Sequence, residues 1–125
     1  MTSFKTLNNI AGWLTFAVAA VVLGAAAQPT GSLWDCGEFI AGAYKLQVVH
    51  PPGAPIFLLV GRLFTWVASL FSDHPSTIAY SVNLLSALST AAAAMFICWS
   101  TTILGRLALE GRGHEPQGGA ALAVI

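Results

Sequence analysis

Three long apolar runs dominate the pattern of hydrophobic and polar positions along this chain. They cover residues 10–27, 56–71 and 77–104, and segments rich in polar residues, glycine and proline separate them. A helix that crosses the hydrocarbon core of a bilayer needs about 20 apolar residues. The first and third runs are long enough, whereas the second covers roughly 24 Å at about 1.5 Å per residue. The pattern therefore predicts an all-α, multi-pass membrane protein with three transmembrane helices.

A shorter amphipathic segment, residues 36–49, lies between the first two runs. Four of its apolar or aromatic residues recur at helical spacing, and the lysine that follows them can extend to lipid headgroups. These residues are Phe39, Ile40, Ala43, Tyr44 and Lys45. Because the residue before a proline avoids the α region, the prolines after His50 are predicted to stop this helix. We therefore expect an interfacial helix at 36–49 in the first loop.

The composition supports a bilayer environment. Hydrophobic residues make up 56% of the 125 residues and charged residues only 8%, against about 25% charged residues in soluble domains. The net charge is zero and there is no basic run, so nothing points to nucleic acid. Two cysteines, Cys36 and Cys98, are too few for a disulfide framework.

The first apolar run has a second interpretation. Lys5 followed by residues 10–23 and by Ala25-Ala26-Ala27 also fits a cleaved signal peptide. The two later runs favour a transmembrane helix instead. The last six residues, 120–125, begin a further apolar run, and we therefore expect an N-terminal fragment of a longer multi-pass protein.

Charge gives little information about topology. Three crossings place the loop at 28–54 and the polar connection at 105–119 on one side, which carries Lys45, Arg106 and Arg112. Lys5 lies on the other side. Positive-inside counting mildly favours a cytoplasmic position for the larger loop, and the family resemblance given below overrides it.

Two acidic residues stand at the beginning of the segment at 36–49: Asp35 directly precedes it and Glu38 is its third residue. Their spacing predicts a capping box, with Asp35 as N-cap and Glu38 at the third helical position. The same spacing places both carboxylates on one helix face, where either could act as a base. Partial desolvation beside a membrane is expected to raise the pKa of Glu38 toward that of a useful base.

Two basic side chains are the remaining candidates. His50 can return toward the carboxylates if the segment folds back; otherwise it is a histidine at a helix C-terminus. Arg62 lies about 10 Å into the second apolar run. A charge inside a membrane is costly, so a charged residue there is a candidate for a functional role. Its partner could be Asp35, Glu38 or a lipid phosphate, and snorkelling is the alternative. Asp35, Cys36 and His50 lack zinc-ligand spacing, so a zinc site is not expected, and the sequence leaves a divalent metal open.

Two short motifs now resemble a known family. They read W-D-C-G-E-F at 34–39 and H-P-P-G-A-P at 50–55. Together they resemble the protein O-mannosyltransferase group of the GT-C membrane glycosyltransferases, and most of all a family of bacterial multi-pass proteins. The resemblance covers residues 10–104. O-mannosyltransferases of this group have adjacent acidic residues, whereas Cys36 and Gly37 intervene here.

The resemblance implies the N-terminal part of a GT-C fold in a bacterial inner membrane, with the loop at 28–54 in the periplasm. It implies transfer of a sugar from a polyprenyl-phosphate donor to a protein or glycan hydroxyl, without an organic cofactor and with no metal named. A phosphate leaving group lets one base suffice, unlike the carboxylate pair of glycosidases. The implied catalytic residues are Asp35 and Glu38, and the implied substrate-binding residues are Trp34, His50 and Arg62.

Two other function classes stay open. In a transporter or flippase-like protein, Asp35, Glu38 and Arg62 would line a polar pathway near the bilayer midplane. In a non-catalytic scaffold, the loop at 28–54 would serve only packing. The depth of Asp35 separates catalysis from transport, because a glycosyltransferase needs this carboxylate at the membrane surface.

Overall fold

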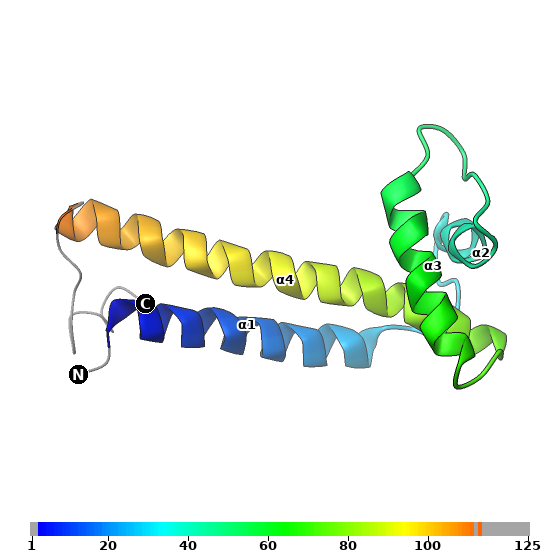
Figure 1. Cartoon of the computed structure of the whole chain (residues 1–125), viewed down its shortest axis with the longest axis horizontal. Coiled ribbons are helices and arrows are strands. Elements are labelled where there is room, and N and C mark those ends of the chain that lie inside the picture. Colours follow the sequence, from blue (N-terminus) through cyan, green and yellow to red (C-terminus); the bar gives the residue numbers. More distant parts are fainter. Residues whose placement is uncertain (1–2, 112, 114–125) are drawn as a thin grey trace. The chain divides into compact units, whose positions relative to one another are not determined.

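A computed structural model describes residues 3–111 and 113, which form four α-helices (Figure 1). They are α1 (Phe4–Ala26), α2 (Cys36–Lys45), α3 (Pro55–Ser69) and α4 (Pro75–Glu110). The all-α class predicted from the sequence is confirmed for these residues. The short apolar run at 120–125 lies outside the described part of the chain.

The two long helices extend beyond their apolar runs. α1 begins at Phe4 and α4 continues to Glu110, so both include polar residues that the hydrophobic pattern assigned to connections. Gly111 has a φ of 73° and donates its N–H to the Leu107 carbonyl at 3.2 Å. A glycine in the left-handed region is a common end of a helix. The polar end of α4 is therefore set by Gly111.

α2 ends earlier than the sequence predicted. Leu46 adopts a left-handed conformation, with φ 51° and ψ 46°, directly after the last helical residue. Gln47 then donates its N–H to the Gly42 carbonyl at 3.0 Å, an arrangement that closes many helix C-termini. The predicted end at Val49 is therefore wrong, because the turn at Leu46 stops the helix before the prolines can.

Two of the helices, α1 and α4, are long and apolar enough to cross a membrane. α3 has 15 residues, or about 22 Å at 1.5 Å per residue. This length is below the roughly 30 Å of a hydrocarbon core. α3 thus falls short of the second membrane span that the sequence predicted.

The described contacts divide the chain into two compact units. Unit 1 comprises Met1–Val22 and Ser89–Ile125. In it, Asn8 accepts hydrogen bonds from the Trp99 indole at 3.0 Å and from the Thr102 hydroxyl at 2.5 Å. A Cβ added at Gly12 would lie 1.9 Å from the Trp99 indole nitrogen. The absence of a side chain at this position lets the indole lie against α1.

Unit 2, Leu23–Leu88, contains α2, α3 and the predicted site residues. Its buried core joins α2, the following segment, α3 and α4 through Ala43, Val49, Leu58 and Val82. α2 and α3 approach closely where Gly61 faces Ala43, since a Cβ at Gly61 would lie 2.8 Å from that of Ala43. This packing fixes α2, and with it the carboxylates at its beginning.

Candidate active site

The segment that leads into α2 is tied to α4 by Asn83. Its amide donates hydrogen bonds to the carbonyls of Gln28 at 2.7 Å and Thr30 at 3.0 Å. Its oxygen lies 3.4 Å from the Cys36 thiol at the first position of α2. Asn83 therefore positions the residues around Asp35. The sequence interpretation did not include it in the site, although an amide inside an apolar run was a signal.

The segment after α2 folds back toward the beginning of that helix. The left-handed turn at Leu46 reverses the chain, and Val49 is then buried with only 3% exposure. Its side chain packs at Gly42, where an added Cβ would lie 2.8 Å from Val49 Cγ1. Burial of Val49 therefore brings the next residue, His50, over the first turns of α2.

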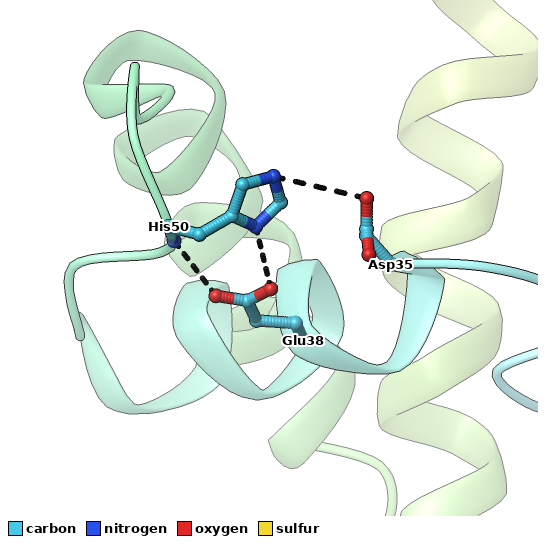
Figure 2. Close-up of side chains that lie close together, drawn as sticks. All are labelled: Asp35, Glu38 and His50. Carbon is cyan, nitrogen blue, oxygen red and sulfur yellow. Dashed lines mark hydrogen bonds and ion pairs between the residues drawn. The ribbon is translucent and has the colours of Figure 1, made fainter.

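His50 meets both carboxylates there (Figure 2). Its backbone N–H donates to Glu38 Oε1 at 2.8 Å, and its Nδ1 lies 2.8 Å from Glu38 Oε2. On the other side of the ring, Nε2 lies 3.8 Å from Asp35 Oδ2. The three side chains are 42–49% exposed. The structure thus brings together Asp35, Glu38 and His50, which we call the carboxylate–histidine cluster.

The predicted capping box is not formed. Asp35 occupies the N-cap position of α2 but makes no side-chain hydrogen bond to the helix. The Glu38 carboxylate is turned to His50 instead of back to the Asp35 backbone. One carboxylate cannot serve both partners fully, and His50 offers it two donors.

Hydrogen bonding to His50 also reverses the expected titration of Glu38. Its side-chain hydrogen bond to the His50 ring, and then the bond to the His50 backbone, lower the pKa of Glu38. The expected rise from desolvation is therefore wrong for this carboxyl. The same hydrogen bond to the Glu38 carboxylate, followed by the charge of Glu38 and more weakly that of Asp35, raises the pKa of His50.

An aromatic contact holds the imidazole from the apolar side. The Phe39 ring meets the His50 ring edge to face at 6.3 Å and the Phe57 ring at 5.6 Å. Such pairs add a preferred geometry to the burial of the rings. Phe39 therefore links the cluster to the core of unit 2.

Arg62 has a different partner from those predicted. Its guanidinium donates to the Tyr44 carbonyl in the last turn of α2 and lies 5.5 Å from the centre of the Tyr44 ring. Carbonyls in the last turn of a helix lack partners within the helix and attract cations. Arg62 thus caps α2 at the end opposite to Asp35 and Glu38.

Trp34 precedes the cluster directly and is 98% exposed. Its φ of 53° lies in the left-handed region, which costs a bulky residue about 1–2 kcal/mol. A strained, exposed aromatic residue beside a carboxylate is a reason to infer a function. Its predicted role in substrate binding stays a prediction.

The cluster also has a spacing that a cation could share. One ligand atom from each of Asp35, Glu38 and His50 lies within 4.8 Å of the others. The hydrogen bonds between Glu38 and His50 account for the spacing of these two residues, and Asp35 lies beside them as the residue before α2. We assign no metal, and the expectation of a site without an organic cofactor stays a prediction.

A cavity of about 400 Å³ adjoins the cluster within unit 2. It is bounded by the beginning of α2, by α3 and by α4, and most of its walls are apolar. Its lining includes Cys36, Phe39, Ile40, Phe57, Val82 and Asn83. Cys36 and Phe39, which directly follow Asp35 and Glu38 in the sequence, are therefore part of the cavity wall.

Comparison with known proteins identifies the family to which this chain is similar. A family model described as the protein O-mannosyl-transferase TMEM260 N-terminal domain matches residues 35–125. The match begins at Asp35 and includes Glu38 and His50.

Two curated relatives carry the same name. The protein O-mannosyl-transferase tmem260 of Dictyostelium discoideum is 27% identical over 84 residues, which are 67% of this chain and 10% of the relative. The TMEM260 protein of Mus musculus is 41% identical over 66 residues, 53% of this chain and 9% of the relative. The chain thus spans about a tenth of the length of these relatives. No solved structure matches it.

Proposed function

This chain belongs to the family of the protein O-mannosyl-transferase TMEM260 N-terminal domain, and from that premise we propose that it supplies part of the active site of a GT-C-type membrane glycosyltransferase. The intact protein transfers a sugar, by this proposal a mannose, from a polyprenyl-phosphate donor to a protein hydroxyl. The observation that carries the proposal is the convergence of Asp35, Glu38 and His50 within the residues that the family model matches.

The proposal gives the two carboxylates different roles, which their contacts support. Glu38 is engaged by two hydrogen bonds from His50. Within the described part of the chain, Asp35 makes only the 3.8 Å side-chain contact with His50. Asp35 therefore has oxygens available for an acceptor hydroxyl, and we assign it as the general base. Glu38 assists by holding His50.

The reaction needs one base. The acceptor oxygen attacks the anomeric carbon, the bond from this carbon to the phosphate oxygen breaks, and the electron pair leaves with the lipid phosphate. Because the phosphate is already a good leaving group, no opposed acid of the glycosidase kind is required. The exposed face of Trp34 offers an apolar, electron-rich surface to the C–H bonds of a sugar ring.

The surroundings of the cluster support a lipid-linked donor. The cluster lies between α1 and α4 along the chain, outside both helices that are long enough to cross a membrane. The apolar cavity next to it could receive part of the donor lipid. We place the loop at 28–54 on the non-cytoplasmic side, which in a bacterium is the periplasmic side of the inner membrane.

Substitution of Asp35 tests the proposal. In the intact protein, Asp35→Asn removes the proton acceptor while keeping the size of the side chain. We expect the rate of sugar transfer from a polyprenyl-phosphate donor to fall by about 10²–10⁴-fold. Asp73→Asn is the matched control, since Asp73 is an exposed residue in the turn before α4. Full activity of Asp35→Asn would contradict the assignment of the base.

The two competing function classes receive less support. The transporter pathway required Arg62 beside the carboxylates, and Arg62 contacts Tyr44 instead. The scaffold alternative predicts that Glu38→Gln and His50→Ala leave both folding and transfer unchanged. Assay of these two variants in the intact protein distinguishes a scaffold from an enzyme.

A further inference from the structure

The hydrogen bonds of His50 define which ring nitrogen carries the proton. An ionised carboxylate only accepts hydrogen bonds. Since Glu38 Oε2 lies 2.8 Å from Nδ1, Nδ1 is the protonated nitrogen of the neutral ring. Nε2 then presents a lone pair toward Asp35 Oδ2 at 3.8 Å.

This leaves two proton acceptors facing each other. A separation of 3.8 Å is too long for a direct hydrogen bond. One water molecule can bridge it, with about 2.8 Å to each atom. With neutral His50 the cluster carries a charge of −2, so uptake of a proton at Nε2 reduces the repulsion between its carboxylates. The arrangement therefore favours transfer of a proton from Asp35 to Nε2 of His50.

We propose that His50 is the proton relay of this site: Nε2 takes up the proton that Asp35 removes from the acceptor hydroxyl, while Glu38 positions the imidazole from the opposite side. This inference rests on the proposed glycosyl transfer. It changes His50 from a residue that shapes the site into one that carries a proton.

The proton balance of one turnover is complete. The acceptor oxygen forms its bond to the anomeric carbon, and its proton moves to Asp35 as the bond to the phosphate oxygen breaks. The proton then moves from Asp35 to His50 Nε2, which restores the Asp35 carboxylate for the next acceptor. The His50 side chain is 49% exposed, so the imidazolium can release the proton to water.

The charged groups around the imidazole explain why it holds a proton well. Among the described residues, the titratable groups that pair with His50 are Asp35 and Glu38, both at the beginning of α2. Arg62 of α3 lies at the opposite end of α2, on Tyr44. The hydrogen bond to Glu38 and the charge of Glu38 are the main causes that raise the pKa of His50, and the charge of Asp35 adds to them.

Chemical labelling tests the coupling without an activity assay. Diethyl pyrocarbonate reacts with the unprotonated imidazole nitrogen, so the pH dependence of labelling reports the pKa of each histidine. In the intact protein, peptide mass spectrometry should place the labelling midpoint of His50 at a lower pH in Glu38→Gln than in the wild type. His74, which contacts Ser76 rather than the cluster, is the internal reference and should not respond.

The pH dependence of sugar transfer tests the relay itself. The relay needs an unprotonated Nε2, so the rate of sugar transfer should rise with pH through the pKa of His50. Glu38→Gln removes the main cause that raises this pKa, and the acid limb should move to lower pH. His50→Gln should lower kcat at neutral pH by about 10²-fold and abolish that limb. His74→Gln should keep the wild-type profile.

A purely structural role for His50 gives a different result. It predicts a rate that falls equally at all pH values in His50→Gln, with the acid limb in place, and this outcome would overturn the relay. A labelling midpoint that does not respond to Glu38→Gln would also overturn it, because the positioning bond would then be absent. The intact protein could also transfer no sugar while Glu38→Gln still moves the labelling midpoint of His50. In that case the proposed function fails, and the hydrogen bond between Glu38 and His50 is retained.

Discussion

Trp34 shows how a single residue can oppose stability. Its left-handed φ of 53° is unfavourable for a large side chain, and its indole is 98% exposed. We expect Trp34→Gly and Trp34→Ala to raise the KM for sugar transfer alike, since both remove the ring. Only glycine adopts this conformation without a steric cost, so Trp34→Gly should be more stable than Trp34→Ala by about 1 kcal/mol.

Denaturant unfolding in detergent measures that difference, and Asp73→Asn serves as the reference for an exposed substitution. Equal stability of the two variants would show that the backbone at Trp34 is relaxed. Unchanged KM values in both would remove Trp34 from the substrate site.

At the scale of the helices, the close approach of α2 and α3 holds the cluster in place. A Cβ at Gly61 would lie 2.8 Å from Ala43 Cβ, which is fixed to its own backbone and cannot rotate away. Gly61→Ala should therefore destabilise the protein by about 1–3 kcal/mol. Adding Ala43→Gly restores the space and should recover part of this loss, a coupling that a double-mutant cycle measures.

Gly42→Ala is the matched control for that cycle. Its added Cβ would meet the ends of the Val49 and Leu58 side chains at 2.8 and 3.1 Å, and these side chains can move. We expect a smaller loss than for Gly61→Ala. A similar or larger loss would mean that backbone contact does not limit the packing of α2 on α3.

For the whole molecule, the length of α3 decides the number of membrane crossings. α1 and α4 are long enough to cross, whereas α3 has 15 residues. If α3 does not cross, the turn before α4 lies on the same side as the carboxylate–histidine cluster. Single cysteines at Ser32 and Asp73, in a protein with Cys36 and Cys98 replaced by serine, should then react with an impermeant maleimide from the same side.

A label at position 73 that reacts from the opposite side would show that α3 completes a crossing. The side of the cluster relative to the beginning of α1 is the same in either case, because only α1 lies between them. The proposed active site therefore depends on the orientation of α1 and is independent of whether α3 spans.

The amino-acid sequence named candidate residues, and the structure shows how they contact one another. Asp35, Glu38 and His50 are among the few titratable residues of an apolar chain, and their catalytic and binding roles stay predictions. The pairing of His50 with Glu38 could be stated only as a condition, that the segment folds back. Asn83 and the capping role of Arg62 were missed, because a hydrogen bond to a backbone carbonyl distant in sequence leaves no periodic signal.

The sequence by itself determined the all-α class and the approximate positions of the helices, because helix formation and membrane length depend on local patterns of apolar residues. Only the tertiary structure decided where α2 ends, which partner Glu38 chooses and what Arg62 binds. These depend on the backbone conformation of Leu46, on the burial of Val49 and on contacts between separate segments. The candidate chemistry thus resides in local residue types, and its geometry results from how unit 2 packs.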